Sequence, residues 1–282
     1  MLGGSLGLAL KQRRLAGSVI GLVRRAASAR EVVRVGAVDD ATRDLAMAVS
    51  GSDLVILCTP IAQMRPLMVQ MQPWLAAGAV VTDVGSVKRS VVQDLEPLAR
   101  QVGAHFVGSH PMAGAEKTGV GAARADLFAG AVCVVTPSPT TAPTAVRKVE
   151  QVWRSLGSRL IRLTPELHDQ LVSRSSHLPH LLASQLAHYV LDPGHSARQL
   201  DLCANGFRDT TRIASSSPEM WRDIVLANRQ NLVGALDGFA RELRNLRRLL
   251  QSEDGDAISR FFEQARDRRD RWALRAISSS PE

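Results

Sequence analysis

The segment 108–114 (Gly-Ser-His-Pro-Met-Ala-Gly) places a histidine, His110, shortly after the apolar run 105–107. Histidine has an unperturbed pKa close to neutrality, so a positioned imidazole can accept or donate a proton there. The run predicts a short strand, and the glycines predict a turn that another molecule can approach closely. Ligands bind at the ends of strands in open α/β sheets, so His110 is our first candidate for acid–base chemistry. An isolated loop histidine is more often structural than catalytic, so the assignment of His110 depends on further motifs in the chain.

The N-terminal residues have the pattern of a phosphate-binding loop. Residues 1–10 contain Gly3 and Gly4 ahead of an apolar helical pattern, and they match the end of a dinucleotide fingerprint. The complete fingerprint is a strand, then G-x-G-x-x-G, then the helix, and here only the third glycine and the helix are present. We therefore predict a domain without its first strand, and an in-frame strand with Gly-x-Gly upstream of Met1. An ordinary glycine-rich N-terminus explains the pattern equally well.

Two arginines follow the next apolar run. Arg24 and Arg25 come directly after residues 18–23, where a NAD-specific protein carries an acidic residue for the ribose hydroxyls. A guanidinium suits a 2′-phosphate, because it forms charge-assisted bidentate hydrogen bonds with it. The pair therefore favours NADP as the cofactor and leaves NAD possible.

Composition narrows the class of protein. The chain has 282 residues, 45% of them hydrophobic, which is enough for two domains. It contains neither a long apolar run for a membrane span nor a secretory leader, so we expect a cytoplasmic protein with no membrane contact. The three cysteines are widely spaced and predict buried thiols rather than a metal site.

The net charge of +8 comes mainly from arginines near the C-terminus. They alternate with Asp267, Asp270, Glu253 and Glu263 at helical spacing, which is typical of a solvated helix face. We therefore expect no nucleic-acid partner, and a basic protein would favour an anionic small substrate.

Hydrophobic periodicity predicts two domains. The predicted strands cover 18–23, 53–58, 79–83, 105–107, 131–136 and 159–163, and the predicted helices in this half cover 5–14, 41–49, 64–75 and 89–102. This alternation predicts an α/β Rossmann-like domain with a parallel sheet over 1–164. Residues 165–282 have only long amphipathic helical patterns, which predict an all-α domain. Its apolar faces exceed what one thin layer can bury, so we expect a homodimer formed through these helices.

Five motifs occur in an order that matches a known family. They are Thr82-Asp83-Val84-Gly85-Ser86-Val87-Lys88, the segment 108–114, His168-Asp169, Ser176-His177-Leu178-Pro179-His180 and Gly206-Phe207-Arg208-Asp209-Thr210-Thr211-Arg212. Together they closely resemble the prephenate/arogenate dehydrogenases of tyrosine biosynthesis, and the missing acidic residue makes the chain most similar to the NADP-dependent arogenate dehydrogenases of cyanobacterial type. The resemblance implies oxidative decarboxylation of arogenate or prephenate to tyrosine or 4-hydroxyphenylpyruvate, with hydride transfer to NADP.

The resemblance also implies roles for individual residues. His110 is the catalytic histidine that takes the proton of the substrate C4 hydroxyl, and Ser86 orients that histidine or the hydroxyl. The substrate-binding residues are Arg212, which grips a carboxylate, His177, Ser173, Ser216, Glu116 and Asp209, which holds Arg212 or a neighbouring helix. The cofactor-binding residues are Gly3, Gly4, Arg24, Arg25, Thr59 and Pro60.

Simpler interpretations accompany several of these roles. His177 and His180 are three residues apart on a helix, and such pairs are often structural. Trp221 is more often a core or interface aromatic than a stacking residue, and Glu116 fits a surface carboxylate equally well.

Two other functions are compatible with parts of the sequence. Other β-hydroxyacid-type dehydrogenases share this domain arrangement but usually use a catalytic lysine in the helical domain. The lysines of this chain are Lys11, Lys88, Lys117 and Lys148, and none of them lies in the predicted helical domain, which argues against this alternative. A non-catalytic dimeric homologue would explain the incomplete fingerprint. The complete set of catalytic side chains from Ser86 to Arg212 favours the enzyme.

Overall fold

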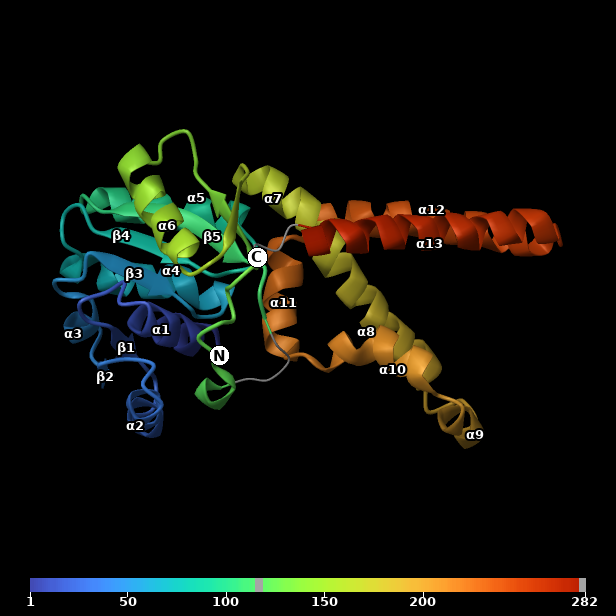
Figure 1. The fold of residues 1–282 in the computed structure, drawn as a ribbon, viewed down its shortest axis with the longest axis horizontal. Coiled ribbons are helices and arrows are strands. Elements are labelled where there is room, and N and C mark those ends of the chain that lie inside the picture. The colour runs from blue at the N-terminus through green and yellow to red at the C-terminus, as the bar shows by residue number, and fades with distance from the viewer. Residues whose placement is uncertain (115–118, 279–282) are drawn as a thin grey trace. The chain divides into compact units, whose positions relative to one another are not determined.

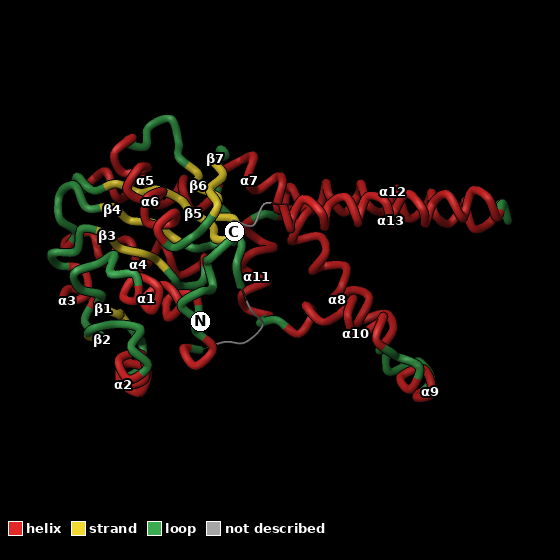
Figure 2. Tube along the Cα trace, in the orientation of Figure 1, coloured by secondary structure: helices red, strands yellow, loops and turns green. Residues whose placement is uncertain are grey.

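The computed structural model describes residues 1–114 and 119–278 of the chain. It divides into two compact units, Met1–Arg229 and Gln230–Glu282, which are described separately. All strands of the described residues lie in the first unit, before residue 163 (Figure 2).

The strands form two sheets. They are β1 (Ile20–Leu22), β2 (Asp40–Thr42), β3 (Leu54–Leu57), β4 (Val80–Asp83), β5 (His105–Pro111), β6 (Val132–Thr136) and β7 (Arg159–Arg162). β1 and β2 pair in parallel, and the second sheet has the order β3-β4-β5-β6-β7. Every pairing in it is parallel except that of β5 with β6. The fold is therefore Rossmann-like, with one antiparallel pairing that the sequence pattern did not predict.

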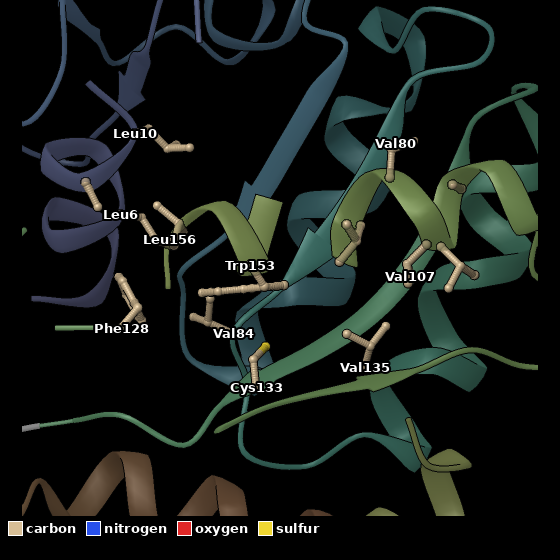
Figure 3. Close-up of a cluster of buried hydrophobic side chains, with 14 residues drawn as sticks. Leu6, Leu10, Val80, Val84, Val107, Phe128, Cys133, Val135, Trp153 and Leu156 are labelled. Carbon is tan, nitrogen blue, oxygen red and sulfur yellow. The ribbon is translucent and has the colours of Figure 1, made fainter. Parts of the chain in front are cut away.

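Helices cover both faces of the larger sheet (Figure 1). The helices of this part are α1 (Leu2–Gln12), α2 (Ala26–Arg34), α3 (Leu45–Val49), α4 (Ile61–Met71), α5 (Arg89–Gln101) and α6 (Pro143–Ser155), with the short 3₁₀ turns η1 (Gln72–Trp74) and η2 (Val120–Ala122). α1 and α6 share one buried cluster with the sheet, in which Trp153 lies among Val84, Cys133 and Leu156 (Figure 3). α4 and α5 form the other cluster, around Phe106. This two-layer burial fixes the ends of β4 and β5, where the candidate residues lie.

Only helices follow β7 in the described residues. In the first unit they are α7 (Pro165–Val172), the π-helical turn η3 (Ser173–His177), α8 (Leu178–Val190), α9 (Ala197–Asp201), α10 (Asn205–Thr211), the 3₁₀ turn η4 (Arg212–Ser215) and α11 (Pro218–Ala227). α7 begins with Pro165 after Thr164, whose hydroxyl accepts from the N–H of Leu167, a standard helix start. The second unit contains nearly all of α12 (Arg229–Gln251) and α13 (Gly255–Ser278), joined by a short turn at Glu253.

One predicted element is wrong in type, and two helices were missed. The helix predicted over 41–49 begins as β2 and becomes helical only at Leu45, where Asp44 caps α3. Helices α2 and α6 were not predicted, and α2 buries none of its residues.

The N-terminal part of the domain starts with a helix. No strand precedes α1 among the described residues, and β1 and β3 belong to separate sheets. Hydrogen bonding across the domain is therefore interrupted between β1 and β3. None of the described helices has the length and apolar character that a membrane crossing requires.

Candidate active site

His110 lies inside a buried strand rather than on the turn that the sequence suggested. β5 continues to Pro111, and His110 pairs with Val134 of β6. The reason is Gly108: a Cβ at this position would lie 2.5 Å from the Thr136 hydroxyl oxygen and 2.9 Å from a Val92 methyl. The glycine thus permits close packing against β6 and α5 rather than a turn. The strand holds the His110 ring, which is 8% exposed, in a fixed direction.

A second histidine holds the His110 ring. His110 Nδ1 lies 2.9 Å from His168 Nε2, and His168 Nδ1 lies 2.8 Å from Asp169 Oδ1. His168 and Asp169 are adjacent on α7 and are almost completely buried. The three side chains form one chain of hydrogen bonds that starts at the candidate base.

Asp169 also binds the start of α5. Its Oδ1 accepts from the N–H of Lys88 at 2.7 Å, and its Oδ2 accepts from the N–H of Arg89 at 3.0 Å. A carboxylate at this position satisfies two N–H groups that a helix N-terminus leaves unpaired and lies favourably in the helix dipole. Asp169 therefore connects α7, α5 and the histidine pair.

The hydrogen bonds assign the tautomers of both rings. Because Asp169 Oδ1 is an acceptor, His168 carries its proton on Nδ1 and accepts at Nε2. His110 then donates from Nδ1, and its Nε2 retains a lone pair. Burial lowers the pKa of His110 well below its usual value, with smaller contributions from His168, Lys88 and His177. The ring is therefore neutral at physiological pH, and Nε2 can act as a base.

A third histidine, His177, carries its proton on the other ring nitrogen. Asn228 Nδ2 donates to the backbone carbonyl of Asp169 at 2.9 Å and lies 3.1 Å from His177 Nδ1. An amide nitrogen can only donate, so His177 accepts at Nδ1 and carries its proton on Nε2. That buried Nε2 has no hydrogen-bond partner among the described residues. His177 lies in the π-helical turn η3, a feature that is frequent at functional sites. It offers a hydrogen-bond donor close to the base.

His180 and Trp221 form the wall of an adjoining groove. Their rings stack at 3.5 Å, and Trp221 contacts His177 edge-on at 5.9 Å. The groove has a volume of about 530 Å³, is formed by α8, η4 and α11, and is lined in part by His180, Ser216 and Trp221. Trp221 thus stacks on His180 and lines the groove.

The buried histidines make stability sensitive to acid. Burial is the main cause that lowers the pKa of His177 to about 4, with a partly opposing effect of Asp169, and burial lowers the pKa of His180 to about 4. As the pH falls, each histidine binds its proton in the unfolded state before it does so in the folded state. The contribution of these histidines to the free energy of unfolding is therefore fully present above pH 6.5 and is lost as the pH falls towards 4.

We expect the wild type to lose about 2 kcal/mol more unfolding free energy than His177→Gln between pH 7 and pH 4.5. Urea denaturation at a series of pH values measures this difference. Parallel stability curves for the two proteins would contradict it.

A buried ion pair supports the loop between β4 and α5. Lys88 Nζ binds Asp83 with both side chains completely buried, and it also donates to the carbonyl of Ser109 at 2.9 Å. Asp83 accepts from the N–H groups of Ser109 and Gly85 at 3.1 and 2.8 Å. Burial lowers the pKa of Lys88, and the carboxylate of Asp83 opposes this shift. The pair ties the loop that carries Ser86 to β5 at Ser109, the residue before His110.

The N-terminus of α1 fits a dinucleotide. No side chain caps this helix, so its first N–H groups can bind a phosphate. A Cβ at Gly3 would lie 3.2 Å from Cβ of Cys58, which places the helix start beside the end of β3. The next residue, Thr59, has a buried hydroxyl oxygen with no partner among the described residues. An orphaned hydroxyl beside a free helix end is the polar environment that a dinucleotide requires.

The other predicted residues have the following positions. Ser86 is partly exposed in the β4–α5 loop, Ser173 is buried and donates to the carbonyl of Gln170, and Ser216 donates to the carbonyl of Ile213. Gly4 packs against Val120 and Ala123, Pro60 precedes α4, and Arg24 and Arg25 are exposed after β1. Asp209 and Arg212 are exposed on α10 and η4, which pack against α8, and Glu116 lies outside the described residues.

Of the predicted residues, the structure brings His110, His177 and the Ser86 backbone together. The carbonyl of Ser86 lies near enough to His177 to raise the pKa of its ring slightly against the effect of burial. The ring of His110 is held by His168, and no hydrogen bond joins it to Ser86 in the described structure.

Sequence reasoning gave no role to His168, Asp169, Lys88, Asp83 or Asn228. His168-Asp169 was visible only as a dipeptide in one motif, and nothing in its spacing indicates a partner 58 residues earlier. The available signal was an adjacent histidine and carboxylate in an apolar helical pattern, which is unusual in a buried position.

A Rossmann-like domain with an uncapped helix N-terminus and a buried, neutral histidine is the arrangement expected of a nicotinamide-dependent dehydrogenase. The model of the prephenate dehydrogenase nucleotide-binding domain matches residues 6–162, and that of the prephenate dehydrogenase dimerization domain matches residues 164–264. The chain therefore belongs to the prephenate dehydrogenase family.

Individual relatives agree with this assignment. The chain is 34% identical to a prephenate dehydrogenase of Bacillus subtilis over 100% of its own length and 76% of that protein. A prephenate dehydrogenase of A. aeolicus, solved with hydroxyphenyl propionate and NAD+, has 32% identity and a TM-score of 0.89 and covers 96% of this chain and 94% of that one. An arogenate dehydrogenase of Synechocystis has 30% identity and a TM-score of 0.80, with 96% of each chain covered.

Proposed function

We propose that this chain catalyses the oxidative decarboxylation of prephenate or arogenate, with hydride transfer to NADP. The observation that supports this most is the buried, neutral His110, whose free Nε2 can accept the proton of a substrate hydroxyl. Relatives named for both substrates support the same reaction.

The substrate is a cyclohexadienol with a ring carboxylate and a C4 hydroxyl. His110 Nε2 accepts the hydroxyl proton as the C4–H bond breaks, and the O–H electron pair becomes part of a C=O bond. The bound nicotinamide supplies the hydride acceptor. His177 Nε2–H donates to a substrate carboxylate oxygen, which would give this buried donor the partner it lacks in the protein.

The remaining predicted residues complete the site in this proposal. Arg212 binds a substrate carboxylate through its planar guanidinium, with Asp209 supporting its helix. Ser86, Ser173, Ser216 and Glu116 are the further substrate-binding residues. Gly3, Gly4, Thr59 and Pro60 line the cofactor site. The domains are 1–164 for the cofactor and 165–282 for the substrate and a homodimer contact, in a cytoplasmic protein.

Cofactor preference rests on Arg24 and Arg25, which are exposed directly after β1. We expect the double variant Arg24→Ala/Arg25→Ala to raise the KM for NADP by about 10- to 100-fold, because charge-assisted hydrogen bonds to the 2′-phosphate are lost. The KM for NAD should stay unchanged. Arg30→Ala, which removes an exposed arginine from α2, is the control. Equal effects on NADP and NAD would contradict the assignment.

A spectrophotometric assay tests the proposed function. The full chain is given prephenate or arogenate with NADP or NAD, and reduced nicotinamide is followed at 340 nm. We expect turnover with at least one substrate and a higher kcat/KM with NADP. No turnover in any of the combinations would favour the non-catalytic homologue instead.

A further inference from the structure

A series of hydrogen bonds extends from Nδ1 of His110 into the protein, although proton acceptance at Nε2 needs only the His110 ring itself. It runs from His110 to His168 to Asp169 and then to the backbone N–H groups of Lys88 and Arg89. Among the described residues it meets no further titratable side chain beyond Asp169. A base that must pass its proton to solvent would need a hydrogen-bonded route to solvent. This series of hydrogen bonds ends instead at the backbone N–H groups that begin α5.

The balance of the proposed reaction explains why no outlet is needed. Hydride loss from C4 and proton loss from the hydroxyl first produce a C4 carbonyl. When the C–C bond to the carboxylate breaks, its electron pair enters the ring, CO₂ leaves, and the C4 oxygen becomes a phenolate. That oxygen then takes back one proton to form the phenol. The proton that His110 accepts is therefore the proton that it must return, and none is released overall.

The neighbouring charges suit a proton that is held and returned. When His110 takes up the proton, its Nδ1–H still faces the lone pair of His168 Nε2, and the carboxylate of Asp169 faces the other side of His168. His168, Lys88 and His177 all disfavour a positive charge on His110, and Asp83 is paired with Lys88. The protonated ring is therefore short-lived and returns its proton, while the hydrogen bond between Nδ1 and His168 keeps the ring in place.

We propose that His168, held by Asp169, is a positioning residue that keeps His110 in its Nδ1–H tautomer and holds its ring in place. This inference rests on the proposed function. Without His168 the Nδ1–H of His110 would be a buried donor with no partner, and the ring could turn over or exchange tautomers, so that Nε2 would no longer face the hydroxyl as an acceptor.

The tautomer can be measured without any turnover. In protein labelled with ¹⁵N-histidine, two-bond ¹⁵N–¹H correlation spectra at pH 7.5 should show that His110 is neutral and that both His110 and His168 carry a proton on Nδ1. Assignment follows from the loss of one set of signals in His110→Asn and another in His168→Gln. A wild-type His110 protonated on Nε2 would overturn the proposal, whatever the activity of the enzyme.

Two variants test the consequence for catalysis. His168→Phe removes the acceptor with little change in ring size, and we expect kcat to fall by about 100-fold. His168→Gln can place an amide oxygen near Nδ1 of His110, so we expect a smaller loss of about 10-fold. The substrate Kd should change by less than about threefold in both. His105→Gln, at the other end of β5 and about 17 Å away along the strand, is the matched control.

The outcomes separate this inference from the proposed function. If the wild type turns over and His168→Phe keeps kcat within about threefold, the positioning role is wrong while the function stands. If the wild type does not turn over with either substrate, the function is wrong, and the tautomer measurement still decides the arrangement of the rings. Equal losses in the Phe and Gln variants, with near-native circular dichroism, would also contradict the role of the acceptor.

Discussion

Replacing His110 by asparagine should reduce kcat by about a thousandfold while the substrate Kd changes little. Asparagine can hydrogen-bond a hydroxyl from a similar position, but it cannot take up a proton at neutral pH. The site around it, including His177 and the groove beside Trp221, would stay in place to bind the substrate. Steady-state kinetics measure kcat, and titration calorimetry in the absence of cofactor measures the substrate Kd.

The pH dependence of the wild type is the second measurement of the same prediction. Because burial lowers the pKa of His110 well below its usual value, the ring is neutral over the whole physiological range. We therefore expect kcat to be independent of pH between about 6.5 and 8, and to fall only in more acidic solution as Nε2 becomes protonated. A kcat that rises tenfold across this range, or a His110→Asn variant with wild-type kcat, would exclude His110 as the base.

The sequence singled out His110 as the candidate base but predicted a turn where the structure has the strand β5. Its two neighbouring glycines are typical of a turn, and the apolar run before it ends at Val107. In the structure, Gly108 is inside β5 because there is no room for a side chain next to Thr136 and Val92. Periodicity cannot distinguish a glycine required by packing from one required by a turn, since the distinction depends on elements far along the chain.

The overall fold was predictable because hydrophobic periodicity extends over many residues. Details that depend on short or non-periodic segments were not predictable. Alternating apolar strands and amphipathic helices identify a Rossmann-like domain and a helical part, because these periods repeat over many residues. The antiparallel pairing of β5 with β6 depends on how the chain returns through 112–131, which has no periodic signal. The strand β2, at Asp40–Thr42, is too short for alternation to be recognised.

The partners of the candidate base were the least predictable part. His168 and Asp169 are adjacent in sequence, yet they act toward His110 and toward the start of α5, which are 58 and about 80 residues away. Local sequence shows that a histidine and a carboxylate sit on α7 but contains nothing about which element α7 packs against. The same holds for Asn228, which fixes the tautomer of His177 from the end of α11.

Replacing Lys88 by methionine should lower the free energy of unfolding by about 3–5 kcal/mol. Methionine has a similar length but no charge, so Asp83 would stay completely buried without its cation. The carbonyl of Ser109 would lose its donor at the same time. Thermal and urea denaturation measure the loss, which corresponds to a fall in Tm on the order of 10 °C for a unit of this size.

A second lysine–aspartate pair in the same domain provides the matched control. Lys148 binds Asp53 at 2.7 Å, but these side chains are 34% and 89% exposed, so Lys148→Met should cost only about 0–1 kcal/mol. The double variant Asp83→Asn/Lys88→Met should be more stable than Lys88→Met alone, because it removes the unpaired buried charge. Equal effects of Lys88→Met and Lys148→Met would show that burial does not govern the Lys88 pair. In that case the β4–α5 loop would be held mainly by Asp169, through its hydrogen bonds to the N–H groups of Lys88 and Arg89.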